Sequence, residues 1–151
     1  MASRIILDCV PELQEKYYAW AELMSRAGLK HKLTCTLRTQ AEQSVLFMQG
    51  RGPIERVNGE RIKIGLIPIR AEDNIIVTKL KTIGKHGEGK AFDIALMKHI
   101  GGDKETVYYN LKISVNDNDI PDYKEAADLG VKAGLQNGGL LWGWDFCHYE
   151  I

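Results

Sequence analysis

An α+β domain is the fold class that the sequence favours, and three observations indicate it. Two helical segments come early in the chain, several short segments with β-type patterns follow, and one more helical segment comes late. At 151 residues the chain matches the usual size of one domain and can bury a core without disulfides. We therefore expect a single domain over residues 1–151.

The first predicted helix covers residues 11–27. Apolar residues recur there at steps of four and three, which marks one face of an amphipathic helix. These residues are Leu13, Tyr17, Trp20, Met24 and Ala27. Pro11 suits the first helical turn and Gly28 a C-terminal stop. The aromatic residues of this face are expected to lie in the core.

A strand and a second helix are predicted next. Residues 32–37 alternate polar and apolar side chains and are rich in β-formers, so they predict a strand. Thr39-Gln40-Ala41-Glu42 has the form of a capping box and starts a helix that runs to about Gln49. Arg38 therefore lies at a strand-to-helix corner, where side chains commonly face a cleft.

Residues 50–74 are irregular, and Asn58-Gly59 between β-type residues predicts a type I′ hairpin. Further strands are predicted at residues 75–77, 91–97 and 106–115. A last helix is expected over residues 123–133, opened by Pro121 and Asp122 and closed by Gly134. A loop at residues 137–139 and an apolar segment then lead to Asp145.

The numbers of charged residues and cysteines, and the absence of long apolar runs, exclude several classes of protein. Lys plus Arg and Asp plus Glu are 20 each, so no net field attracts nucleic acid or an anionic membrane. Cys9, Cys35 and Cys147 form no C-x-x-C pair, and free thiols are expected. The chain has no signal-like start and no apolar run of about 20 residues, so synthesis in the cytoplasm without membrane association is expected.

Two segments carry residues that suit a hydrolytic metal site. His86 and Asp93 are seven apart in a glycine-rich stretch, and this spacing suits a loop that enters a strand. Hydrolytic zinc sites usually take three protein ligands from His, Asp and Glu and leave one position for water. His86, Asp93 and His148 would form such a set, and Asp145 could act as the general base.

Zinc is the expected ion. Two imidazoles are poor ligands for magnesium, and an open site with mixed nitrogen and oxygen donors is what hydrolytic zinc uses. His31 and His99 lie outside this pattern and are expected at the surface. Trp142 and Trp144 could line a groove, although core packing is the commoner place for tryptophan.

The stretch from Gly84 to Asp93 resembles the S-x-H-x-x-G-x-A-x-D signature of the zinc D-Ala-D-Ala metallopeptidases, which include VanY-type carboxypeptidases and phage L-alanyl-D-glutamate endolysins. His86, Gly89, Ala91 and Asp93 stand on its fixed positions, whereas Gly84 replaces the serine. Asp145-x-x-His148 resembles the later acid-x-x-His element of the family. The resemblance implies a small antiparallel sheet with flanking helices, of the hedgehog/D,D-peptidase type.

The same resemblance implies a substrate-binding role for two more residues. The family carries an arginine followed five residues later by glutamine, and Arg38 and Gln43 match this pair. Arg38 would hold the substrate carbonyl or a carboxylate as negative charge builds on the oxygen. By comparison with the family, residues 50–74 resemble an insertion, either a lip of the substrate groove or a surface flap.

The resemblance implies a zinc peptidase that hydrolyses a stem-peptide bond of peptidoglycan. A phage-type L-alanyl-D-glutamate endopeptidase is expected, made in the host cytoplasm and acting on the wall after release, as a monomer. A D-alanyl-D-alanine carboxypeptidase is the alternative within the enzyme class. A non-catalytic, zinc-stabilised binding module of the same fold is the alternative outside it, and Asp145 argues against that because a structural site needs no base.

Overall fold

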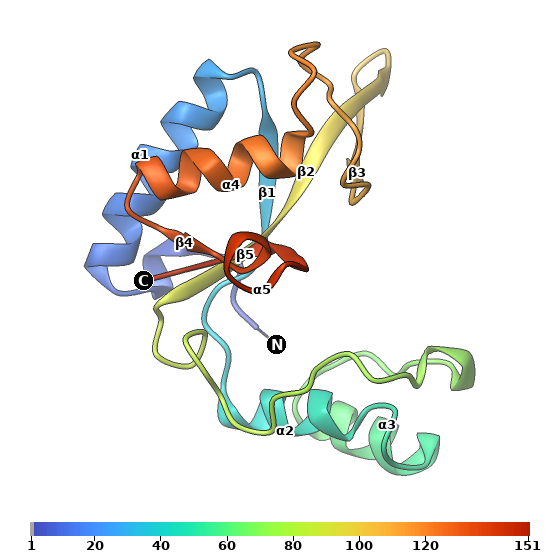
Figure 1. Cartoon of the computed structure of the whole chain (residues 1–151). Helices are drawn as coiled ribbons and strands as arrows, with labels where there is room; N and C mark the ends of the chain where they lie inside the picture. Colours follow the sequence, from blue (N-terminus) through green and yellow to red (C-terminus); the bar gives the residue numbers. More distant parts are fainter. Residues whose placement is uncertain (1) are drawn as a thin grey trace.

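The computed structural model describes residues 2–151 and has the α+β fold that the sequence predicts, with helices beside a small open antiparallel sheet (Figure 1). The helices are α1 (Pro11–Arg26), α2 (Gln40–Met48), α3 (Ile54–Lys63), α4 (Asp122–Lys132) and α5 (Gly138–Trp142), with short 3₁₀ turns at Ile6–Asp8 and Ala71–Asp73. The strands are β1 (Lys30–Cys35), β2 (Ala91–Gly101), β3 (Lys104–Tyr108), β4 (Gln136–Asn137) and β5 (Asp145–Glu150).

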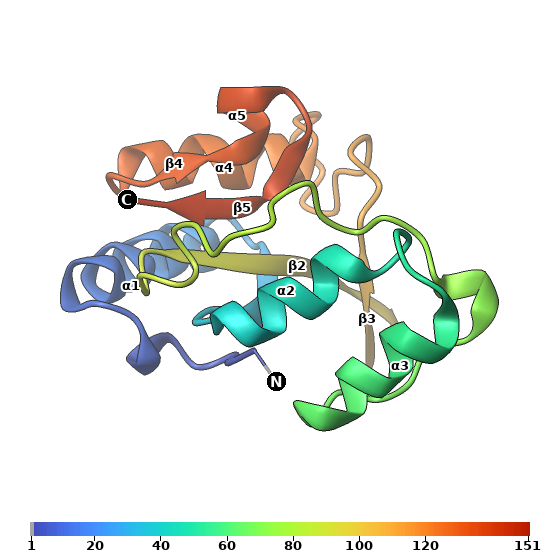
Figure 2. The same ribbon diagram turned by 90° about the horizontal axis from the view of Figure 1, so that it is seen from below.

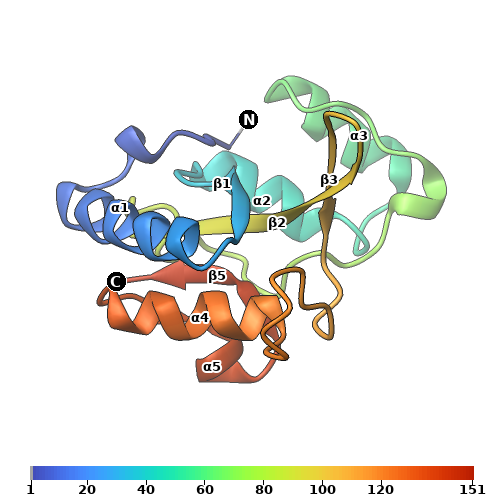
Figure 3. The same cartoon turned by 90° about the horizontal axis from the view of Figure 1, so that it is seen from above.

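The long strand β2 is the centre of the sheet, whose order is β1-β2-β5-β4, with β3 also paired to β2. All pairings are antiparallel. Asp93 is the register partner of Cys35 in β1 and of His148 in β5, so these two strands lie on opposite edges of β2. Figure 2 shows β5 along one side of β2, and Figure 3 shows β1 and β5 on its two sides. The sheet therefore joins segments that are far apart in the sequence.

The pairing of β1 with β2 contains a bulge. Leu33 pairs with Ile94 and Cys35 with Asp93, so two steps along β1 match one step along β2. In a regular strand, Leu33 and Cys35 would point to the same face. The extra residue turns Cys35 to the face opposite the core, while Leu33 still packs against the core.

One face of the sheet carries the hydrophobic core, covered by α1 and α4 (Figure 3). Phe92 in β2 and its register partner Tyr149 in β5 stack with ring centroids 5.2 Å apart. Trp20 of α1 packs on both rings and donates a hydrogen bond of 3.0 Å to the carbonyl of Ala126 in α4. Apolar burial and this bond fix the two helices against the sheet.

Local signals predicted three of the helices correctly. α1 begins at Pro11 and is followed by Gly28 with φ +74°, a conformation that glycine adopts easily. α2 has Thr39 as its N-cap, and the Thr39 hydroxyl accepts a hydrogen bond of 3.2 Å from the backbone N–H of Glu42. α4 closely matches the predicted late helix and leads to Gly134 with φ +87°.

The hairpin predicted within residues 50–74 is wrong, because α3 runs through Asn58-Gly59. Val57 on this helix is fully buried. Asn58 donates a side-chain hydrogen bond to the carbonyl of Ile69 and accepts one from its N–H, at 2.9 and 2.8 Å. These two hydrogen bonds attach the segment around Ile69 to α3. They and the burial of Val57 outweigh the preference of Asn-Gly for a turn.

Three other predicted elements differ from the structure. Residues 75–77 form no strand and are mostly exposed, because no neighbouring strand pairs with them. β3 ends at Tyr108, where the chain leaves the edge of β2, although the alternating pattern continues to Val115. The predicted loop at residues 137–139 instead begins α5, since Asn137 accepts hydrogen bonds from the N–H groups of Gly139 and Leu140.

α2, α3 and the link that follows them form a lobe on the side of the sheet away from α1 and α4 (Figure 1). α2 packs on α3, and Gln49 and Asn74 tie the link to these helices through hydrogen bonds to backbone groups. None of the helices in residues 2–151 has the length and apolarity that crossing a bilayer requires.

His31 is half-buried against α1 and not at the surface as predicted, whereas His99 is exposed. Its Nε2 lies 2.9 Å from the Tyr17 hydroxyl, and its ring lies 4.6 Å from that of Trp20. Burial lowers the pKa of His31 from 6.5 to about 4. The neutral imidazole is therefore favoured in the folded protein.

This shift predicts a loss of stability in acid. Between pH 6.5 and about 4 the unfolded chain binds a proton at His31 that the folded chain does not, so stability falls as pH falls through this window. The full effect is about 3 kcal/mol, at 1.36 kcal/mol per pH unit. Chemical denaturation of His31→Phe should show a flatter pH dependence than wild type, and His99→Phe should match wild type. Equal slopes for all three proteins would contradict the prediction.

Candidate metal centre

The face of the sheet opposite the core carries a row of three polar side chains. Cys35, Asp93 and His148 occupy directly paired positions on β1, β2 and β5. Side chains at paired positions point to the same face with Cβ atoms about 5 Å apart. The hydrogen-bonded sheet thus sets the spacing of a thiol, a carboxylate and an imidazole.

His86 reaches this row from the loop before β2. The backbone N–H of Arg38 donates to the carbonyl of His86 at 3.2 Å, and the N–H of Val10 donates to the carbonyl of Gly89 at 3.0 Å. Gly89 has φ +67°, and a side chain there would come within 3.4 Å of the Cys9 backbone. The two attachments and the glycine turn hold the imidazole over the sheet.

The inward-facing atoms of the two histidines meet at one carboxylate oxygen. His86 Nε2 lies 3.2 Å and His148 Nδ1 3.0 Å from Asp93 Oδ1. The ring centroids of the histidines are 5.1 Å apart. The structure therefore brings together the three residues that the sequence predicts as metal ligands.

The outward-facing nitrogens of both rings have oxygen partners. His86 Nδ1 lies 2.7 Å from the carbonyl oxygen of Thr36, and His148 Nε2 lies 2.9 Å from Glu150 Oε2. Metal-binding histidines usually donate their second N–H to such an acceptor, which fixes the tautomer and the ring. With those protons placed outward, the inward nitrogens have lone pairs available for an ion.

Cys35 adds a fourth donor that the sequence analysis missed. One ligand atom from each of Cys35, His86 and Asp93 lies within 4.8 Å of the other two. The thiol sulfur is 3.7 Å from His86 Nδ1, on the side of the ring that also faces Thr36. Imidazole, carboxylate and thiol are all ligands of transition metals, so the donors fit such an ion.

The ionisable side chains of the candidate metal centre shift one another's pKa values. Burial acts to lower the pKa of His86, but hydrogen bonds to Asp93 and Cys35 raise it to about 10. Burial likewise acts to raise the pKa of Asp93, but hydrogen bonds from His148 and His86 hold it below its ordinary value. Protons therefore compete with a metal for these donors, and metal binding releases them.

Asp145 is the first residue of β5 and is half-buried. Burial, and then the negative charge of Asp93, raise the pKa of Asp145, while the charges of His148 and His86 oppose the rise. These interactions put its carboxylate in the electrostatic field of the candidate ligands. The neighbouring Trp144 is 65% exposed and does not pack in the core.

A pocket of about 260 Å³ opens beside the two histidines. Its lining includes four of the six predicted site residues: Arg38, Gln43, His86 and His148. Asp93 lies beneath the histidines, and Asp145 is not part of the lining. Trp142 is also a lining residue, and its ring centroid is 5.4 Å from that of His148. The pocket is thus lined by charged, polar and apolar side chains.

Arg38 is held at the pocket by two contacts. Its Nη1 donates to Gln43 Oε1 at 2.9 Å, and its Nη2 donates to Cys35 Sγ at 3.3 Å. Its buried Nε has no hydrogen-bond partner among residues 2–151. A buried donor without an acceptor is costly. The guanidinium is therefore suited to receive an anionic or carbonyl oxygen in the pocket.

The contact between Glu150 and His148 can be tested by metal affinity. Glu150→Ala should weaken metal binding about 10- to 100-fold, the usual effect of losing a group that orients a ligand histidine. Competition with a chromophoric chelator measures the change. Glu88→Ala removes an exposed carboxylate from the loop that carries His86 and should leave the affinity unchanged. An equal effect of both substitutions would show that Glu150 has no specific role.

Comparisons with known proteins identify a fold. No protein-family model matches the chain, and no curated protein sequence is significantly similar to it. Among solved structures, the L-Ala D-Glu endopeptidase ChiX of Serratia marcescens superposes with a TM-score of 0.57 at 14% identity, covering 100% of this chain and 88% of that one. The chain thus has the fold of that endopeptidase, with the candidate metal centre described above on one face of its sheet.

Proposed function

We propose that the protein is a zinc-dependent peptidoglycan peptidase that hydrolyses the L-alanyl-D-glutamate bond of a stem peptide. The convergence of His86 Nε2 and His148 Nδ1 on Asp93 Oδ1, beside a pocket that contains Arg38, carries the proposal. The similarity in fold to an L-Ala D-Glu endopeptidase supports the choice of bond. The buried Arg38 Nε, which has no partner among the described residues, offers a donor for a substrate oxygen.

His86, Asp93 and His148 would hold the ion. When bound there, zinc supplies a Lewis acid for the peptide carbonyl and lowers the pKa of a water molecule. Asp145 takes a proton from the attacking water at its carboxylate and transfers it to the leaving amine. The raised pKa of Asp145 brings this carboxylate closer to the neutral range in which such a transfer is efficient.

Arg38 orients the substrate. Its guanidinium is fixed by Gln43 and Cys35, so little side-chain entropy is lost when an oxygen binds. Negative charge that develops on the carbonyl oxygen is stabilised by a donor already in place. Trp142 lines the pocket beside His148 and offers an apolar surface to the substrate.

Digestion of purified muropeptides tests the proposal. Mass spectrometry should show products cut between L-alanine and D-glutamate, and a chelator should stop the reaction until zinc is restored. Release of free D-alanine instead would indicate a carboxypeptidase. No cleavage of any muropeptide by the zinc-loaded protein would refute the proposal.

A zinc-stabilised module without catalytic activity is the second candidate, and Cys35 is the observation that favours it. If its thiolate joined His86, Asp93 and His148, four protein ligands would close the coordination shell, as in structural zinc sites. Such a protein would bind zinc, lose stability with chelator and cleave nothing. The absorption spectrum of the cobalt-substituted protein separates the two candidates, because only a thiolate ligand gives a thiolate charge-transfer band.

A further inference from the structure

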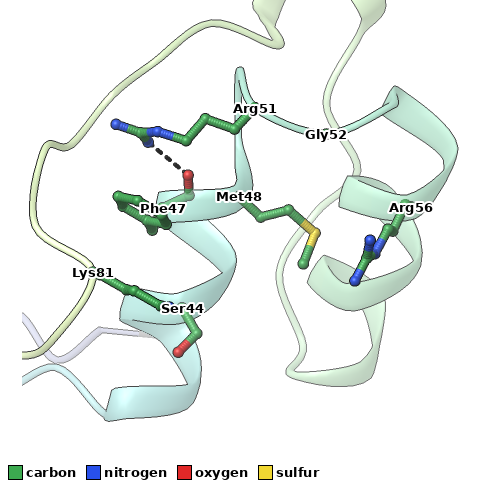
Figure 4. Close-up of a pocket in the computed structure, with 7 residues that line it drawn as sticks. All are labelled: Ser44, Phe47, Met48, Arg51, Gly52, Arg56 and Lys81. Atoms are coloured by element: carbon green, nitrogen blue, oxygen red, sulfur yellow. Dashed lines mark hydrogen bonds between the residues drawn. The ribbon is translucent and has the colours of Figure 1, made fainter.

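A second pocket, of about 340 Å³, lies between α2 and α3 (Figure 4). Phe47 and Met48 of α2 give it an apolar floor, and three cationic side chains stand around them: Arg51, Arg56 and Lys81. Ser44 and Gly52 complete the lining, which contains no acidic residue. The positive charges suit an anionic group, and the apolar floor suits an alkyl chain attached to it.

The three cations of this pocket are not neutralised by neighbours. Within residues 2–151, none of them takes part in an ion pair. Arg56 stands one turn before Glu60 on α3 and lowers the pKa of Glu60 by its charge, but the ion-pair partner of Glu60 is Lys63, at 2.8 Å. Like charges around one cavity repel, and an anion bound among them would relieve that repulsion.

Arg51 is fixed in place without losing its charge. Its guanidinium lies 3.9 Å from the centre of the Phe47 ring and donates to the carbonyls of Phe47 and Thr78, at 2.7 and 3.1 Å. Figure 4 shows the Arg51 side chain beside Phe47 at the end of α2, with Arg56 on the facing helix. The side chains of Arg56 and Lys81 have no hydrogen bond to the described residues in the structure and can turn towards a ligand.

The cationic pocket adjoins the pocket at the metal centre. Gln43 lines the pocket at the metal centre, whereas Ser44, the next residue of α2, and Phe47, four residues or about 6 Å along the helix from Gln43, line the cationic pocket. Thr78 and Leu80 line the pocket at the metal centre and Lys81 lines the cationic pocket, and Gln43 Nε2 holds this segment through the carbonyl of Leu80 at 2.6 Å. An extended chain advances about 3.3 Å per residue. A peptide bound in the pocket at the metal centre therefore reaches the cationic pocket within a few residues.

We propose that the cationic pocket binds a carboxylate of the peptide substrate, a few residues from the bond that is cut. The inference rests on the proposed function of the neighbouring site. Arg56 and Lys81 contact the carboxylate, Arg51 supplies fixed positive charge, and Phe47 and Met48 contact the adjoining alkyl groups. The lobe that carries α3 thereby selects acidic peptides over neutral ones.

Kinetics with two substrates test the proposal. One is a capped L-Ala-D-Glu dipeptide amide, which fills only the pocket at the metal centre. The other is a longer stem peptide, whose free carboxylate extends to the cationic pocket. Arg56→Gln/Lys81→Gln should raise KM for the longer peptide about tenfold, leave kcat unchanged and leave the short peptide unaffected. The matched control Lys63→Gln/Lys79→Gln makes the same change in net charge outside the pocket and should behave as wild type. An equal rise in KM for both substrates would overturn the assignment.

A binding measurement keeps this test independent of catalysis. Titration calorimetry of the whole protein should detect tri-glutamate but not tri-glutamine, and Arg56→Gln/Lys81→Gln should weaken tri-glutamate binding at least fivefold relative to Lys63→Gln/Lys79→Gln. This result would stand even if no peptide were cleaved. Binding of inorganic phosphate without tri-glutamate, or equal tri-glutamate binding by the two double variants, would refute a carboxylate site for peptides.

Discussion

Asp145→Asn is expected to reduce peptide hydrolysis by about 10²- to 10⁴-fold, the usual contribution of a general base. Asparagine keeps the size of the side chain but cannot accept a proton. The carboxylate is not among the atoms that meet at Asp93 Oδ1, so the zinc content of the protein should not change. Initial rates on muropeptides and metal analysis of the same samples measure both effects.

Asp128→Asn is the matched control for Asp145→Asn. Asp128 is a partly exposed residue of α4 that pairs with Lys124, and its substitution should leave the rate and the zinc content unchanged. Joint loss of activity and zinc in Asp145→Asn would assign Asp145 to the ligands instead. Full activity of that variant would exclude it as the base.

Removal of one imidazole is expected to remove the metal. His148→Ala deletes the nitrogen that lies 3.0 Å from Asp93 Oδ1, and zinc affinity should fall by more than the roughly 100-fold effect of losing a group that only orients a ligand. Cleavage should disappear with the zinc. Equilibrium dialysis gives the affinity, and circular dichroism shows whether the sheet is retained.

Cys35→Ser is the informative partner of His148→Ala, because both residues stand beside Asp93 on the sheet. With His86, Asp93 and His148 as the ligands, Cys35→Ser keeps its zinc, and the cobalt-substituted wild type shows no thiolate charge-transfer band. A strong band that Cys35→Ser abolishes would show four protein ligands and a closed site. That result would favour the structural module over the peptidase.

Much of the fold could be predicted from local signals, and the failures have a common physical cause. α1 and α4 have a start residue, a stop residue and an apolar face within their own sequence. The Asn-Gly pair in α3 also carries a local signal, but contacts of Asn58 with Ile69 decide its conformation. Residues 75–77 have strand-like side chains, yet a strand needs a partner, and none of the described strands lies beside them.

The candidate site was predictable where a motif defines it. His86, Asp93 and His148 meet as expected, and Arg38 and Gln43 line the adjacent pocket as a hydrogen-bonded pair. Cys35 was not predictable, because simple alternation puts it on the core face with Leu33. The bulge that reverses this orientation depends on pairing with β2 and leaves no trace in the sequence of β1 itself.

The row of paired residues also bears on the order in which the protein folds. Its members on β2 and β5 are 55 residues apart in sequence, so the donors assemble only after distant segments have docked. An ion that recognises the row binds the native state and not the unfolded chain, and it shifts the equilibrium by mass action. It would act as a cross-link between strands, and amide hydrogen exchange in β5 should accelerate when the ion is withdrawn.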